Sequence, residues 1–582
     1  MISPPLPPLP PPSHGIFSNT SSTSIVSWNH RPILKSRFHS KNPKAIVDAF
    51  KQMLQTDAKP NGITFSIVTR ALSILKEVNS LMSIHVLLLR LGFHSDVFAL
   101  NTLLNAYLTC GCTNTARKVF DEMPKRDVVA WTMLMNGYVR NGRGREAIEL
   151  FFSMRKQGVR SDGRVLVAVF NACGQVNDLS LARELETSLT TSVEVHDIHV
   201  MNALISMYAK CGSMEGASRI FNSVGKKDTV TWNSMVSGYA SCGMMSAARE
   251  VFYLIPIKNE VSWSTLVNGY VQNGSFGEAL NVFNEMRGKG LVGNNAAFTS
   301  AITACGHLGS FGLALGREIH SGMDEQKVLN DVILSTALVD MYAKCGCLKT
   351  STTLFERMKK KKSLVTWNVM IMGMATHGNA PGCFDLFTRL LKEDLTPSGE
   401  TFLGLLLGCA HAGWVDEGRH LFVRMTCIYG ITPQIEHCSC MVQLIGQAGL
   451  LAEAYEFIQK VSVTPDATLW GALLSACNFH GDVQLGELVS RKILELEPLH
   501  TGVYVQLSSM YAKAGMWREV MEIRFKMKEM GIKNRPARSS FELDGTVHEF
   551  FAGEDSHPMT RQIISVLNGI DILLNGGSYQ TR

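Results

Sequence analysis

The chain has 582 residues, of which 46% are apolar, and this composition excludes a wholly disordered polymer. Lysine and arginine number 56 against 50 aspartates and glutamates, so the formal charge of +6 is too small for a protein that condenses nucleic acid through charge alone. The longest apolar stretch, near Phe402–Ala410, is far shorter than the roughly 18–20 residues that cross a bilayer, and we expect no membrane partner.

The first 47 residues contain no aspartate or glutamate. They begin rich in proline, pass through a Ser/Thr segment at Ser18–Ser24, and then collect basic residues from Arg31 to Lys44. This composition predicts an organelle transit peptide and disordered leader over residues 1–43. The Ser/Thr segment favours plastids, whereas the run from Arg37 to Ser40 is typical of the end of a mitochondrial presequence, so either organelle is expected. A disordered tail without a targeting role is the alternative.

An internal repeat dominates the rest of the chain. Its signature is a set of three residues: an alanine, a phenylalanine four residues later, and an apolar residue three residues after that. The set recurs at Ala116/Phe120/Met123, Ala147/Phe151/Met154, Ala217/Phe221/Val224, Ala248/Phe252/Ile255 and Ala279/Phe283/Met286. These offsets line one face of a helix. With a weaker copy at Ala182/Leu189 included, successive copies are 31 or 35 residues apart, which indicates more than one repeat type.

A second helix is predicted upstream of each such stripe. Its apolar face is marked by Trp131/Leu134/Tyr138, Trp232/Met235/Tyr239 and Trp263/Leu266/Tyr270. Glycines at Gly142, Gly243 and Gly274 fall where this helix should end. Because one hairpin cannot bury its apolar stripe alone, neighbours must stack, and the sequence predicts an all-α solenoid with a concave working face.

The segments Asn101–Asp127 and Asn202–Lys210 resemble the pentatricopeptide repeat, and the mixed lengths resemble the plant PLS subclass, which combines standard, long and short motifs. The resemblance implies a right-handed superhelix of helical hairpins with its repeat array over residues 44–466. Residues 467–534 resemble the E extension motifs, and residues 535–582 resemble an E+ motif followed by a short tail. Family frequency adds a slight preference for the mitochondrion.

The resemblance also implies single-stranded RNA as the partner, with one base read per motif by the fifth and last residues. The implied RNA-binding pairs are Asn101/Asp127, Thr132/Asp162, Asn202/Asp228, Asn233/Asn259, Ser264/Asn294, Thr336/Ser363, Asn368/Ser398 and Ser439/Asp466. Long motifs carry Val167 or Leu403 at the fifth position instead. The target implied by the family's code is U-G-n-U-Y-A-n-n-C-n-G. The alternative is that the fifth residues only cap or begin helices, where Asn, Ser and Thr are favoured anyway.

The second residue of each motif is the family's base-stacking position. It is apolar at Phe98, Val129, Val230, Val261, Ile333 and Val365, a series suited to gripping base faces. Burial in the core is the alternative for these six side chains.

No catalytic residue, metal ligand or cofactor is expected. A zinc deaminase needs His-x-Glu together with Cys-x-x-Cys, and neither spacing occurs in the sequence, which ends 24 residues after Pro558. We therefore expect no deaminase domain of the DYW type. The predicted function is site recognition for C-to-U editing of organelle transcripts, with a separate DYW-type cytidine deaminase and other editing-complex proteins as partners.

Three other functions are weighed against this one. An RNA processing, splicing or stability factor could use the same solenoid, although the E-like extension argues against it. A tetratricopeptide-like protein scaffold would follow a 34-residue period, which the 31- and 35-residue spacings disfavour. A self-sufficient deaminase would require a further exon.

Overall fold

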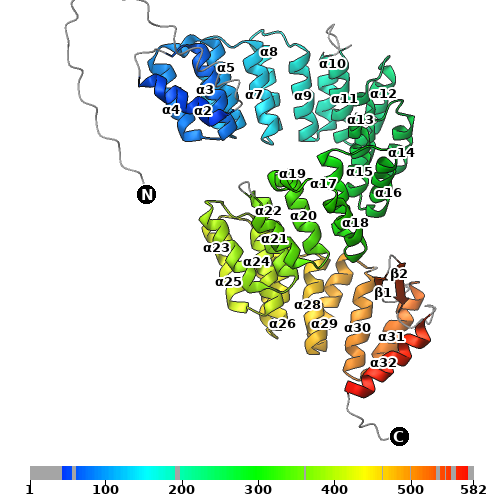
Figure 1. Ribbon diagram of the computed structural model, residues 1–582. Helices are drawn as coiled ribbons and strands as arrows, with labels where there is room; N and C mark the ends of the chain where they lie inside the picture. The colour runs from blue at the N-terminus through cyan, green and yellow to red at the C-terminus, as the bar shows by residue number, and fades with distance from the viewer. Residues whose placement is uncertain are drawn as a thin grey trace, which may run out of the picture. The chain divides into compact units, whose positions relative to one another are not determined.

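Helices make up nearly all of the regular structure in the computed structural model of the protein (Figure 1). The structure describes residues 42–55, 60–189, 197–358, 362–461, 463–498, 500–531, 538–543, 546–551 and 559–574. The predicted leader therefore lies almost wholly outside the described residues. Among the described residues, no helix combines the length and apolarity that crossing a bilayer requires.

The chain divides into two compact units, Met1–Gly238 and Tyr239–Arg582, and the division falls inside one helix, α13. The first unit contains α2 (Pro43–Leu54), α3 (Gly62–Leu75), α4 (Val78–Arg90), the 3₁₀ helix η1 (Phe93–Ser95), α5 (Val97–Thr109), α6 (Thr113–Glu122), α7 (Val128–Arg140), α8 (Gly144–Lys156), α9 (Gly163–Val176), α10 (Leu179–Leu189), α11 (Ile198–Lys210), α12 (Met214–Ser223) and the start of α13 (Thr229–Ser241).

The second unit continues the same pattern. Its helices up to the π-helical turn η3 are α14 (Met245–Leu254), α15 (Glu260–Gln272), α16 (Phe276–Gly288), α17 (Asn295–His307), α18 (Ser310–Ser321), α19 (Glu325–Asn330), α20 (Val332–Lys344), α21 (Leu348–Arg357), α22 (Leu364–Thr376), α23 (Ala380–Lys392), α24 (Gly399–Ala412), α25 (Val415–Val423) and η3 (Arg424–Ile428). It ends with α26 (Ile435–Gln447), α27 (Leu451–Lys460), α28 (Ala467–His480), α29 (Val483–Leu496), α30 (Thr501–Lys513), α31 (Trp517–Glu529), β1 (Arg538–Leu543), β2 (Thr546–Phe551) and α32 (Thr560–Leu574).

Glycine closes the first helix of a hairpin, as predicted. Gly142 has φ 76°, a left-handed conformation that costs glycine little, and its N–H donates to the carbonyl of Val139 at 3.1 Å. Arg143 N then donates to the carbonyl of Tyr138 at 2.9 Å. Gly243 and Gly274 adopt the same conformation, so the chain reverses at equivalent points in successive motifs.

The predicted apolar stripes form the core between neighbouring motifs. Phe120, at the end of one second helix, is 1% exposed and packs edge-to-face on Trp131 of the next first helix, with ring centroids 4.8 Å apart. The same pair recurs as Phe221–Trp232, Phe252–Trp263 and Phe355–Trp367. First helices also pack on first helices, as α5 does on α7, so hairpins stack side by side within each unit (Figure 1).

One antiparallel β-hairpin, β1–β2, departs from the purely helical expectation. Its register pairs Arg538 with Phe551 and Leu543 with Thr546. The hairpin belongs to the segment that resembles the E+ motif.

Candidate nucleic-acid interface

The fifth residues of the predicted motifs do not cap their helices. Asn101 is the fifth residue of α5, Asn202 of α11 and Asn368 of α22, so each lies a full turn inside its helix. Thr132, Asn233, Ser264, Thr336 and Ser439 occupy the same place in α7, α13, α15, α20 and α26. The alternative that these polar residues only cap their helices is therefore wrong.

Capping instead explains the last residues. Asp127 Oδ1 accepts a hydrogen bond from Ala130 N at 2.8 Å and so caps α7, and Asp466 Oδ1 accepts from Leu469 N at 2.8 Å to cap α28. Asp162, Asp228, Asn259, Asn294, Ser363 and Ser398 precede the first residue of the next helix in the same way. The last residue of one motif is thus fixed at the start of the next.

Several predicted pairs meet through this arrangement. Asn101 Nδ2 lies 3.3 Å from both carboxylate oxygens of Asp127. Asn202 Nδ2 donates to Asp228 at 3.4 Å, Asn294 Nδ2 to Ser264 Oγ at 3.4 Å, and Asn368 Nδ2 to Ser398 Oγ at 3.1 Å.

Other pairs are not joined directly. Among the described residues, no hydrogen bond connects Thr132 to Asp162 or Ser439 to Asp466, and Thr336 reaches Ser363 only through the hydroxyl of Thr366. Asn233 lies in the first unit and Asn259 in the second, so each is described by itself.

The bonded pairs leave different atoms free. A carboxylate can only accept hydrogen bonds, so the Asn101 amide must present Nδ2 to Asp127, and its Oδ1 has no partner. Asn202 Oδ1 is likewise without a partner. Asn368 differs, because its Oδ1 accepts a hydrogen bond from Thr401 Oγ1 at 2.7 Å. The two kinds of pair therefore offer different hydrogen-bonding groups.

The carboxylate of a pair is held ionised. Burial acts to raise the pKa of Asp228, but hydrogen bonds from Thr231 and Asn202 oppose it, and the pKa is lowered overall. Asp228 is thus an acceptor at neutral pH and keeps the Asn202 amide in one orientation.

The second residues are exposed, so the alternative of burial in the core is wrong for all six. Their exposed fractions are 63% for Phe98, 50% for Val129, 57% for Val230, 51% for Val261, 72% for Ile333 and 62% for Val365. The second and fifth residues of a helix share one face. Each of these motifs therefore presents an apolar side chain beside its polar fifth residue.

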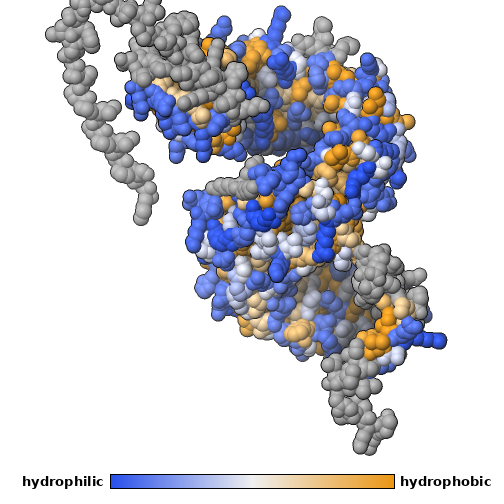
Figure 2. All heavy atoms as spheres, viewed as in Figure 1, coloured by the Kyte–Doolittle hydropathy of each residue, from blue (hydrophilic) through white to orange (hydrophobic). Residues whose placement is uncertain are grey.

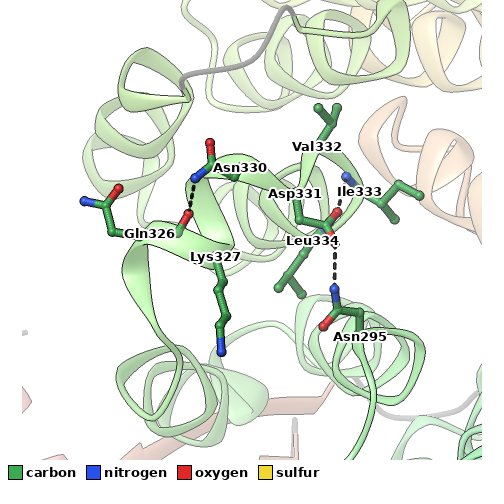
Figure 3. Close-up of a pocket in the computed structure, with 8 residues that line it drawn as sticks. All are labelled: Asn295, Gln326, Lys327, Asn330, Asp331, Val332, Ile333 and Leu334. Carbon is green, nitrogen blue, oxygen red and sulfur yellow. Dashed lines mark hydrogen bonds between the residues drawn. The ribbon is translucent and has the colours of Figure 1, made fainter. Parts of the chain in front are cut away.

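One such residue borders an open pocket of about 660 Å³ (Figure 3). Ile333 lines it together with Lys327 from the short helix α19. Asn295 Nδ2 donates to Asp331 Oδ2 at 2.7 Å, and both residues also line the pocket. The pocket is therefore lined by both apolar and polar side chains.

Comparison with known proteins identifies the repeats. A "PPR repeat" family model matches residues 98–128, 199–228, 230–258, 334–363 and 365–395, and a "PPR repeat family" model matches 126–175 and 258–307. A mitochondrial pentatricopeptide repeat-containing protein of Arabidopsis thaliana is 37% identical over 558 residues, which cover 95% of this chain and 81% of that protein. The chain belongs to the pentatricopeptide repeat family. A chloroplastic Arabidopsis relative is 34% identical over 597 residues, covering 97% of this chain and 76% of the relative.

The pentatricopeptide repeat fold is shared with a solved structure. The crystal structure of the maize protein PPR10 in complex with an 18-nucleotide psaJ RNA element aligns with a TM-score of 0.56 at 18% identity, covering 86% of this chain and 79% of that one. An "E motif" model also matches residues 480–542 of this pentatricopeptide repeat protein.

Two kinds of interface residue were not predicted. Ile63, the second residue of α3, is 60% exposed like its six counterparts. Hydroxyls at the third position support the pairs from beneath, since Thr231 Oγ1 donates to Asp228 at 2.7 Å and Thr401 contacts Asn368. These hydroxyls stand one residue after the second position, where Ser and Thr look like ordinary helix residues. The signal that could have found them is a Ser or Thr at the third position, three residues after the polar residue that ends the preceding motif.

Proposed function

We propose that this pentatricopeptide repeat protein binds single-stranded RNA sequence-specifically and marks sites for C-to-U editing in organelle transcripts. The observation that carries the proposal is the recurrence, in register, of an exposed apolar second residue beside a polar fifth residue that is hydrogen-bonded to the last residue of its motif, as at Phe98/Asn101, Val261/Ser264 and Val365/Asn368. A base can stack on the apolar side chain while its Watson–Crick edge meets the polar pair. The proposed target is U-G-n-U-Y-A-n-n-C-n-G.

The free atoms of the pairs support this target. Oδ1 of Asn101 and of Asn202 is buried and has no hydrogen-bond partner, and an acceptor without a partner suits the N3–H donor of uracil. Asn368 has its Oδ1 occupied by Thr401, so its remaining amide hydrogen offers a donor, which suits N3 of cytosine. These assignments agree with the bases that the family code implies.

The editing role rests on the C-terminal part of the second unit. The E motif over residues 480–542 includes α31, where Trp517, Met521 and Phe525 are 67%, 74% and 64% exposed. Residues four apart share a helix face, so these three form an apolar strip, and apolar surface gathers over α31 and α32 in Figure 2. We propose that this strip recruits a separate DYW-type cytidine deaminase, while the chain itself supplies recognition and no catalysis.

The proposed site of action is an organelle. Relatives named mitochondrial and chloroplastic support it, as does the acid-free leader over the first 47 residues. The alternation of repeat lengths supports assignment to the PLS subclass.

The test is organelle transcriptome sequencing in plants that lack the protein. Loss of C-to-U conversion at one or a few sites preceded by U-G-n-U-Y-A-n-n-C-n-G is the expected result. Complementation with the Trp517→Ala/Met521→Ala/Phe525→Ala triple variant should restore RNA binding but not editing. Normal editing with altered introns or transcript ends would replace the proposal with an RNA processing, splicing or stability role.

A further inference from the structure

A slot in the first unit gathers side chains from three successive motifs. Phe98 of α5 and Val129 of α7 line it, with Asn101 between them and Arg70 contributed by α3. Its volume of about 410 Å³ lies within the range of small-ligand sites. The slot therefore joins two exposed apolar side chains, the polar fifth residue Asn101 and one cation.

The Arg70 side chain has no polar partner among the described residues. The side chain is exposed, and among the described residues it makes no hydrogen bond or ion pair. No carboxylate lines the slot, and Asp127 behind it is already bonded to Asn101 and to Ala130 N. The guanidinium is thus a positive charge without a counter-charge, placed at the edge of a base-sized space.

We propose that Arg70 binds the backbone phosphate of the nucleotide whose base enters the slot between Phe98 and Val129. This inference rests on the proposed RNA-binding function and adds an anchoring residue that lies outside the second, fifth and last positions. A guanidinium matches the geometry of a phosphate and can donate two parallel hydrogen bonds to it. Because every nucleotide carries the same phosphate, the contact strengthens binding without reading the base.

The experiment measures binding of the full chain to fluorescently labelled target RNA by anisotropy across a salt series. Arg70→Gln should weaken binding about five- to tenfold at low salt and reduce the slope of log K against log[salt] by about 0.7, the value for one phosphate contact on a single strand. Arg70→Lys should restore the slope, since the charge returns. The matched control is Arg90→Gln in α4, another exposed arginine that makes no side-chain hydrogen bond or ion pair among the described residues, and it should change neither quantity.

Two further results distinguish a failure of the Arg70–phosphate contact from a failure of the proposed RNA-binding function. The loss of affinity caused by Arg70→Gln should be the same for RNAs that place U or A in this slot. A loss that depends on the base would overturn the phosphate contact, and so would a salt slope equal to that of Arg90→Gln. Either result would leave the proposed function standing. If the unsubstituted chain binds a scrambled RNA as tightly as the target, the proposed function itself fails.

Discussion

At the scale of single residues, the last residue of a motif serves both the fold and the candidate interface. Asp228 caps α13 through Thr231 N at 2.7 Å and accepts from Asn202 at 3.4 Å with the same carboxylate. Ser398 does the same with a hydroxyl, beginning α24 and accepting from Asn368. Because Asp and Ser cap helices about equally well, the choice between them is left to base recognition.

Ser398→Asp should therefore change the preferred ninth base of the target from C to U. The new carboxylate would accept from both Thr401 and the Asn368 amide, as Asp228 accepts from Thr231 and Asn202, and would free Oδ1 of Asn368 as an acceptor. The expected reversal is about 1 kcal/mol, or roughly fivefold in relative affinity. Competition binding between RNAs that differ only at this base measures it. Ser398→Thr, which keeps the hydroxyl, is the control and should retain C; a retained preference for C in Ser398→Asp would contradict the pairing argument.

Phe98→Ala should weaken RNA binding with little effect on folding. The ring is 63% exposed, so its loss removes a stacking surface worth about 1–3 kcal/mol per base rather than core packing. The contrast is Phe120→Ala, where a ring that is 1% exposed is lost and the free energy of unfolding should fall by about 3–5 kcal/mol. Thermal unfolding and binding measured on both variants test the distinction. A similar drop in stability for Phe98→Ala would mean that this side chain belongs to the core.

At the scale of elements, neighbouring first helices approach closely where a glycine faces an alanine. A methyl group added to Gly269 of α15 would lie 2.7 Å from Ala240 Cβ of α13, and Gly373 of α22 stands in the same relation to Ala343 of α20, at 2.9 Å. Helix backbones can pack this tightly only where one side chain is absent. The spacing of the stack therefore depends on a glycine in the middle of a helix.

Gly269→Ala should destabilise the protein although alanine favours helix formation. Overpacking costs about 1–3 kcal/mol, which exceeds the helix-propensity gain of about 1 kcal/mol. Gly277→Ala in α16 is the control, because nothing lies within 4 Å of the added methyl group, and it should be neutral or slightly stabilising. Chemical denaturation of both variants decides the matter. If Gly269→Ala were as stable as Gly277→Ala, the helices would have to tolerate a wider spacing than the structure has.

The sequence predicts these elements unequally. The hairpins could be predicted because Ala116, Phe120 and Trp131 recur in phase, and repeated patterns average out local ambiguity. The strands β1 and β2 and the six-residue helix α19 occur once and are too short for a periodic signal. The exposure of Phe98 could be predicted from its place as the second residue of its motif. Arg70 lines the same slot because of how α3 packs on α5, and no local sequence pattern predicts that packing.

At the scale of the whole molecule, the affinity for RNA would be the sum of the contacts that the separate motifs make with successive bases. Each motif contacts chiefly its neighbours, so the residues that would bind one base come from adjacent motifs. The net charge of +6 supplies only a modest general attraction for RNA. Specificity for the RNA sequence would then depend on how many motifs carry a polar fifth residue. Long motifs interrupt the series, since Val167 in α9 and Leu403 in α24 can make no side-chain hydrogen bond to a base.

The affinity should therefore depend unevenly on the bases along the target. Substituting the third base, opposite Val167, or the tenth, opposite Leu403, should change the affinity of the full chain less than twofold. Replacing the fourth base, a U opposite Asn202 and Asp228, by a purine should cost about 1–3 kcal/mol because the free Oδ1 loses its donor. Competition binding with every single-base variant of U-G-n-U-Y-A-n-n-C-n-G gives the profile. A flat profile would mean that the RNA is held by its backbone alone, and a profile with the same shape shifted by one base would mean that the register of motifs and bases is offset.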